Sequence, residues 1–249
     1  MLSFALLIFS AQVAAGPPSP ARERWELCVD QATGDPAAGL AEAERWRLAG
    51  GGFLAEQCRG MAYATARRWI SAAEAFEVAA REAEVAKDNR AGKYWAQAGN
   101  AWIAAAEPVK ARAALDAALA SGVLAGVELG EAHLDRARAR VAAGDRQGAR
   151  QDLDQAVAKA AADPMTWLLS ATLARQMGDV PLAQKHIYTA IELAGDAAAV
   201  QLEAGNIAAM ARDEAGARTA WAKAVQMAPG SPEAAAARDA LKQFDDVAQ

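Results

Sequence analysis

Small residues recur along the C-terminal half of the chain with a period of 34 residues. Two sets of alanines share this spacing: Ala149, Ala183 and Ala217, and Ala156, Ala190 and Ala224. The pair Gly144-Asp145 likewise returns as Gly178-Asp179. A Gly-Asp pair is suited to end one helix and cap the next. The pattern therefore predicts stacked helix-turn-helix units, with small residues where two antiparallel helices cross closely.

These positions resemble the tetratricopeptide (TPR) repeat, which favours Trp at position 4, Gly or Ala at 8, Ala at 20, a large apolar residue at 24 and Ala at 27. The unit from Ala198 matches best, with the residues Gly205, Ala217, Trp221, Ala224 and Pro229. Further units begin at Phe53, Gly92, Gly130 and Pro164. The resemblance implies an all-α fold, a right-handed α-solenoid of about six helix pairs plus a C-terminal capping helix.

The period is wider in the middle of the chain. Ala72 and Ala111 are 39 residues apart, and Ala111 and Ala149 are 38 apart. We expect the extra residues to form longer inter-repeat loops near 87–90 and 121–126.

The unit from Gly130 departs most from the pattern. It has His133 at the Trp site, and Arg136 and Arg140 at positions that pack in other units. We expect the arginine stems to fill the grooves between helices while their charged heads reach solvent.

The array proper covers 53–231, and both flanks have weaker patterns. Residues 21–52 are predicted to form a degenerate N-terminal repeat, in which Asp35 caps a helix that starts at Pro36. Ser231 and Pro232 repeat this start signal for a capping helix and tail over 232–249. A polar terminal helix covers the last hydrophobic edge of a solenoid.

The first fifteen residues form a separate segment. Residues 1–15 carry no charged side chain, have an apolar core and end in small residues, as a signal peptide does. The run is short for a membrane span, and residues 16–20 form a Pro-rich linker. We predict that 1–15 is removed on export and that the mature protein is periplasmic or secreted in a bacterium. A short hydrophobic tail, or a start codon placed too far downstream, is the alternative.

The composition agrees with packed helices. Hydrophobic residues make up 53% of the chain, many of them alanine, while aromatic residues make up only 6%. The net charge of −5 is spread along the chain and leaves no basic stripe, so a nucleic-acid partner is not expected.

Two cysteines occur, Cys28 and Cys58, and both lie in the N-terminal quarter. In an oxidising compartment we predict a disulfide between them. On the loop-entropy model, a bridge across 30 residues stabilises the fold by about 3–4 kcal/mol. The alternative is two small buried thiols in a reducing cytosol.

The sequence contains no catalytic signature. His133 and His186 lie in different units without a metal-ligand spacing, and Gly50-Gly51-Gly52 lacks the Lys and Ser/Thr of a phosphate loop. Four tryptophans fall on packing positions of the repeat: Trp95, Trp102, Trp167 and Trp221. We therefore expect no enzyme, no cofactor and no metal. An enzyme with an unrecognised site is kept as an alternative, after the two function classes given at the end of this section.

In TPR proteins the first helix of each repeat lines a concave groove. Transferred to this chain, that property implies five partner-binding candidates: Lys93, Asn100, Arg138, Arg175 and Asn206. We expect the asparagines to bind the backbone of an extended or helical segment and the cations to bind its carboxylates. Alternatively, these residues are only solvated helix faces.

The function predicted from the sequence is a non-enzymatic scaffold in the cell envelope that binds a protein or peptide partner. No integral membrane span is expected. The alternative class is structural, a solenoid that associates with itself to form an oligomer.

Overall fold

The computed structural model describes residues 19–247, and this part of the chain contains thirteen α-helices and no strand. They form six pairs and a final helix: α1 (Pro20–Gly34) and α2 (Pro36–Leu48); α3 (Gly52–Thr65) and α4 (Trp69–Val85); α5 (Ala91–Ala104) and α6 (Pro108–Ala120); α7 (Gly126–Ala142) and α8 (Arg146–Lys159); α9 (Pro164–Gln176) and α10 (Val180–Ala194); α11 (Ala198–Met210) and α12 (Glu214–Met227); and α13 (Pro232–Val247). The predicted signal peptide, 1–15, lies outside the described residues, and α1 begins at Pro20, the last residue of the expected linker.

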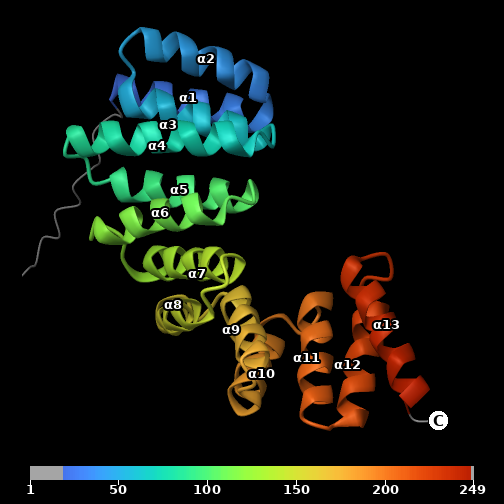
Figure 1. The fold of residues 1–249 in the computed structure, drawn as a ribbon. Helices are drawn as coiled ribbons and strands as arrows, with labels where there is room; N and C mark the ends of the chain where they lie inside the picture. The colour runs from blue at the N-terminus through green and yellow to red at the C-terminus, as the bar shows by residue number, and fades with distance from the viewer. Residues whose placement is uncertain (1–18, 248–249) are drawn as a thin grey trace, which may run out of the picture.

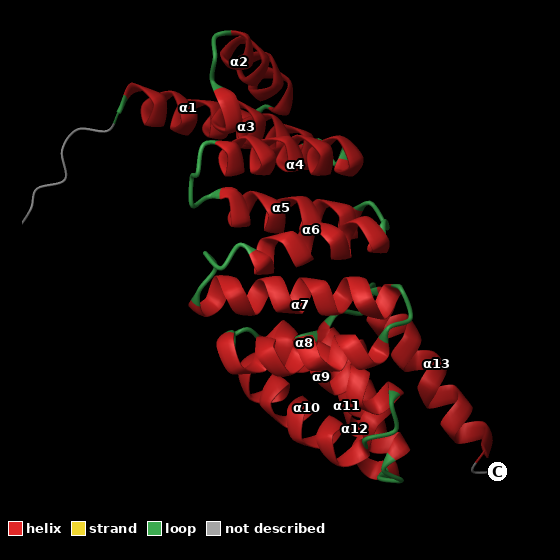
Figure 2. Ribbon diagram, turned by 60° about the vertical axis from the view of Figure 1, so that its left-hand side comes forward, coloured by secondary structure: helices red, strands yellow, loops and turns green. Residues whose placement is uncertain are grey.

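The helices stack in chain order. Each helix packs on its neighbours in sequence, and first helices of successive pairs also touch, as α5 touches α7 and α9 touches α11. Helices α3 to α7 run across Figure 1, whereas α11 to α13 stand upright, so the stack turns near α8 and α9. Figure 2 shows the α1 to α7 stack from another side, with only helices and short loops. The structure is thus an elongated solenoid with two differently oriented halves.

From α3 to α12, the turn within each pair has three residues, and the middle one has a left-handed backbone. Gly144 and Gly178 take this position with φ near 83°. The next residue, Asp145 or Asp179, then caps the following helix by accepting a hydrogen bond from its backbone, at 2.9 and 3.1 Å. The recurring Gly-Asp pair therefore does what the sequence predicts, ending one helix and starting the next.

The two helices of a pair approach where a small residue faces a large one. A side chain at Gly60, Gly99 or Gly205 would overlap Phe76, Leu115 or Trp221, respectively. In each case the large residue follows the glycine by 16 positions and lies on the second helix. This contact holds the pairs at a similar spacing from α3 to α12.

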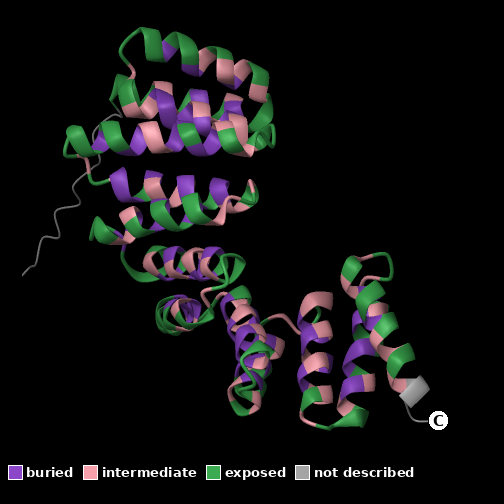
Figure 3. Ribbon diagram, in the orientation of Figure 1, coloured by how far each residue is buried: buried purple, intermediate pink, exposed green. Residues whose placement is uncertain are grey.

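The repeat alanines form the interior of the stack. Both alanine positions of every unit are fully buried, at 0% exposure: Ala72, Ala79, Ala111, Ala118, Ala149, Ala156, Ala183, Ala190, Ala217 and Ala224. The buried faces turn toward neighbouring helices throughout the stack (Figure 3). Of the four tryptophans expected to pack, Trp102 and Trp221 are buried, whereas Trp95 and Trp167 are half-buried.

The extra residues of the central repeats mostly lengthen helices. The loops 86–90 and 121–125 have five residues each, only one or two more than the loop 160–163 or 195–197. Helices α4 and α7 have 17 residues, compared with 14 in α8 and 13 in α9. The expectation of long loops was therefore largely wrong, because most of the inserted residues continue a helix.

A disulfide joins Cys28 of α1 to Cys58 of α3. Both cysteines are fully buried, in a cluster with Trp46. The indole of Trp25 donates a 2.5 Å hydrogen bond to the side chain of Gln57, which links the same two helices. The N-terminal pair is thus fastened to the array covalently as well as by packing.

The helices of the described region are too short or too polar to cross a bilayer. The longest have 17 residues, whereas a span needs about 20 apolar residues.

We predict that Gly205→Ala weakens the array, because the new methyl group would overlap the Trp221 indole. Overpacking of this kind costs about 1–3 kcal/mol of unfolding free energy, measurable by urea denaturation followed by circular dichroism. Gly34→Ala is the matched control, since its methyl group would meet no atom within 4 Å. Equal stability of the two variants would contradict the close contact.

Candidate protein-binding surface

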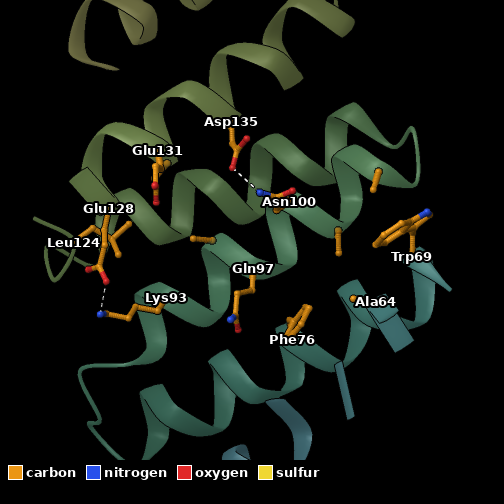
Figure 4. Close-up of a pocket in the computed structure, with 14 residues that line it drawn as sticks. Ala64, Trp69, Phe76, Lys93, Gln97, Asn100, Leu124, Glu128, Glu131 and Asp135 are labelled. Carbon is orange, nitrogen blue, oxygen red and sulfur yellow. Dashed lines mark hydrogen bonds and ion pairs between the residues drawn. The ribbon is translucent and has the colours of Figure 1, made fainter. Parts of the chain in front are cut away.

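A pocket of about 510 Å³ opens on α5, between α7 on one side and α4 with the end of α3 on the other (Figure 4). Its apolar wall consists of alanines together with Trp69, Phe76 and Leu124. Its polar side chains are Lys93, Gln97 and Asn100 of α5 and Glu128, Glu131 and Asp135 of α7. We call it the central pocket. Apolar walls with a few polar groups are typical of ligand-binding clefts.

Two hydrogen-bonded pairs connect α5 with α7 across the central pocket. The Lys93 ammonium lies 2.5 Å from the Glu128 carboxylate. The Asn100 amide donates a 2.8 Å hydrogen bond to Asp135. The partners in each pair are 35 residues apart in sequence, so the pairs repeat the spacing of the units. Both pairs are drawn in Figure 4.

Between these pairs, the corresponding polar side chains have no partner among residues 19–247. Gln97 lies between Lys93 and Asn100 on α5, and its buried Oε1 accepts no hydrogen bond. Glu131 lies between Glu128 and Asp135 on α7, is exposed, and forms no ion pair or hydrogen bond with another described residue. Both groups are hydrogen-bond acceptors, so the middle of the central pocket has unused acceptor capacity.

Asp135 is a carboxylate of the pocket whose ionised form is destabilised by burial. Burial raises its pKa above the ordinary value, and the nearby Arg138 and Asn100 offset this effect only in part. The Arg138 guanidinium lies 3.0 Å from Asp135, one turn along α7. The ionised form of Asp135 is therefore held at a cost to the folded state.

All five candidates proposed from the sequence lie on first helices, in two groups. Lys93 and Asn100 line the central pocket, and Arg138 joins them through Asp135. Arg175 of α9 binds Glu203 of α11 through two contacts of 2.7 and 3.1 Å, and Asn206 donates to the same carboxylate at 3.2 Å.

Each of the three cations among these candidates, Lys93, Arg138 and Arg175, is therefore already paired with a carboxylate of the chain. An incoming acidic segment would have to displace these carboxylates before it could bind.

A buried ionic cluster occupies the irregular α7–α8 unit. Asp152 of α8 is 2% exposed and contacts three side chains of α7. The contacts are His133 at 2.8 Å, Arg136 at 2.6 Å and Arg140 at 3.0 Å. The expectation that the arginine heads reach solvent was wrong, because Asp152 draws Arg136 and Arg140 inward. A buried carboxylate needs such partners, since an unpaired one is strongly destabilising.

The pKa of Asp152 reflects this balance. Burial acts to raise it, but hydrogen bonds from His133 and Arg136 and the charges of Arg136 and Arg140 outweigh burial and hold the pKa below its ordinary value. A depressed carboxyl pKa contributes stability above the unfolded-state pKa and loses it as pH falls through the folded-state pKa.

A second polar link lies where the stack turns. The Arg150 guanidinium of α8 donates to the Ser170 hydroxyl of α9 at 2.7 Å, and this hydroxyl lies 2.7 Å from Nδ1 of His186 on α10. Burial lowers the pKa of His186, and the nearby Arg150 acts in the same direction. His186 also packs edge-on against Trp167. It thus serves as an internal packing residue, and residues 19–247 contain no cluster of side chains suited to hold a metal.

The acidic residues of α7 that line the central pocket, Glu128, Glu131 and Asp135, were not identified from the sequence. Helix α7 begins at Gly126, about one turn before the unit register that starts at Gly130, and this extra turn carries Glu128. Glu131 does occupy a groove position of that register, but only its missing partner distinguishes it from other surface acids. The role of Asp152 could not be predicted either, because the side chains that contact it lie on the preceding helix, α7.

Sequence comparison finds no matching protein-family model and no matching curated protein. Structural comparison does find similar folds. PilW, a widely conserved type IV pilus biogenesis factor, superposes with a TM-score of 0.71 and 18% identity, over 87% of this chain and 97% of PilW. PilF of Pseudomonas aeruginosa gives 0.69 and 14%, over 86% and 96%. YrrB, a TPR protein with an unusual peptide-binding site, gives 0.59 and 18%, over 76% and 91%.

At these identities the likeness is one of fold. It confirms the predicted all-α solenoid of TPR helix pairs.

Two Asp→Asn variants should differ in stability, because the two carboxyl pKa values are shifted in opposite directions. Asp152→Asn leaves buried cations without a counter-charge and should lower the unfolding free energy at pH 7 by about 3 kcal/mol. This deficit should shrink in acid, as the wild-type carboxyl protonates. Asp135→Asn removes a charge whose pKa burial has raised, so stability should be equal or higher at pH 7. Urea denaturation across pH measures both, and an equal loss in the two variants would contradict these assignments.

Proposed function

We propose that this protein is a non-enzymatic scaffold of the cell envelope that binds a segment of a partner protein along its first helices. The observation that carries the proposal is the central pocket, which combines an apolar wall with polar groups from two successive repeats. A partner segment lying across α5 and α7 would bury apolar side chains against the wall and hydrogen-bond to the amides of Gln97 and Asn100.

Rigidity of the pocket supports this function. Alanines and glycines hold its helices in close contact, and the two α5–α7 pairs fix the positions of four polar side chains. A preformed surface binds a flexible segment without also having to order itself. The peptide-binding site of YrrB gives a precedent for such a role on this fold.

The envelope location rests on two further observations. The Cys28–Cys58 disulfide is the kind of bond that persists in oxidising compartments. PilW and PilF supply similar folds, and PilW is a pilus biogenesis factor. With the apolar segment 1–15, these support export to the periplasm or beyond.

Photo-crosslinking in living cells tests the binding surface. A photoreactive residue at Ala104, which is exposed in the central pocket, should yield adducts with a distinct protein. The matched control is the same residue at Ala158, exposed on the outer helix α8. Mass spectrometry identifies the partner and the crosslinked segment. Identical adducts from both positions, or none from position 104, would contradict the proposal, and adducts with a second copy of the chain would favour self-association.

Mass spectrometry of the native protein tests export. The N-terminus should begin after Ala15, because the small residues at 13–15 suit signal-peptide cleavage. Under denaturing, non-reducing conditions Cys28 and Cys58 should not titrate as thiols. An intact Met1 together with two free thiols would place the protein in a reducing compartment instead.

A further inference from the structure

The charge of the central pocket indicates what kind of segment it takes. Resting on the proposed function, we propose that the pocket selects a partner segment with a basic side chain, held at Glu131, and an apolar side chain a few residues away, held at Trp69. This reverses the expectation from the sequence, in which cations of the groove bind carboxylates of the partner.

The polar lining of the pocket has a surplus of acid. It holds three carboxylates, Glu128, Glu131 and Asp135, and one cation, Lys93. Lys93 is already paired with Glu128. A carboxylate entering the pocket would therefore meet negative charge without a free cation to bind it, whereas a lysine or arginine would meet the unpaired Glu131.

Hydrogen-bonding capacity points in the same direction. The free groups in the middle of the pocket are the carboxylate of Glu131 and Oε1 of Gln97, and both only accept hydrogen bonds. Two acceptor oxygens cannot hydrogen-bond to each other, so each can take a donor from solvent or from a partner segment. Lysine and arginine side chains carry three and five N–H donors and no acceptor. A charged hydrogen bond to Glu131 would be among the stronger contacts available.

The far end of the pocket has a different character. Trp69 lies opposite the Lys93–Glu128 pair in Figure 4, beside Ala64 and near Phe76. Trp69 is half-buried, so part of its indole faces the pocket. This end suits an apolar or aromatic side chain. The two ends together define a segment several residues long, since one side chain does not fill a space of about 510 Å³.

Selection from a library of displayed random 12-residue peptides against the purified full-length mature protein tests the proposal. Enriched peptides should carry lysine or arginine near an apolar residue and should bind more weakly as salt increases. Glu131→Gln should weaken their binding about five- to tenfold, because it removes the charge and keeps the shape. Glu192→Gln, an exposed position on α10 outside the pocket, is the matched control and should leave binding unchanged.

The outcomes separate this inference from the proposed function. If acidic or neutral peptides are enriched and they block crosslinking from position 104, the charge preference is overturned but the proposed binding function stands. If basic peptides lose the same affinity in Glu131→Gln as in Glu192→Gln, the pocket does not recognise their charge. This result also overturns the inference. If no peptide is enriched, both fail.

Discussion

The solenoid depends on one contact in each of the five helix pairs from α3 to α12, between a small residue on the first helix and a large residue 16 positions later on the second. In three pairs the small residue is glycine, and no side chain fits in its place. In the α7–α8 and α9–α10 pairs alanine meets Leu153 and Ile187 within the same buried clusters. Close packing of this kind is sensitive to single methyl groups. The spacing of the pairs, and hence the alignment of the first helices along one face, follows from it.

Polar contacts then distinguish individual repeats. Asp116, Arg136 and Asp152 connect α6, α7 and α8, and Arg150 connects α8 with α9. These links run through the part of the stack that changes direction in Figure 1. Ion pairs in partly buried positions contribute less net stability than apolar packing, but they restrict which arrangements the helices can adopt. The apolar contacts therefore build the stack, and the ionic ones define its irregular middle.

The sequence predicted the fold well because the repeat fixes the buried alanines, the turns and the capping helix. The Gly-Asp turns and the Asp35 cap occur where the pattern placed them. The surface was predicted less well. Lys93 and Asn100 do line the central pocket, but their acidic partners lie on the next repeat, 35 residues away. Periodicity locates a residue on a helix face, whereas its partner depends on how two repeats meet in space.

The longer helix α7 has an evolutionary consequence. An insertion of about four residues adds roughly one helical turn, so every residue after it keeps its face and its partners. The added turn at Gly126–Leu129 extends the first-helix face without disturbing the alanines of the unit. Whole-turn insertions thus give a repeat array a neutral route to new surface. Glu128, which neutralises Lys93 at the edge of the pocket, lies in such a turn. A scaffold of this kind can diverge in what it recognises while its interior stays the same.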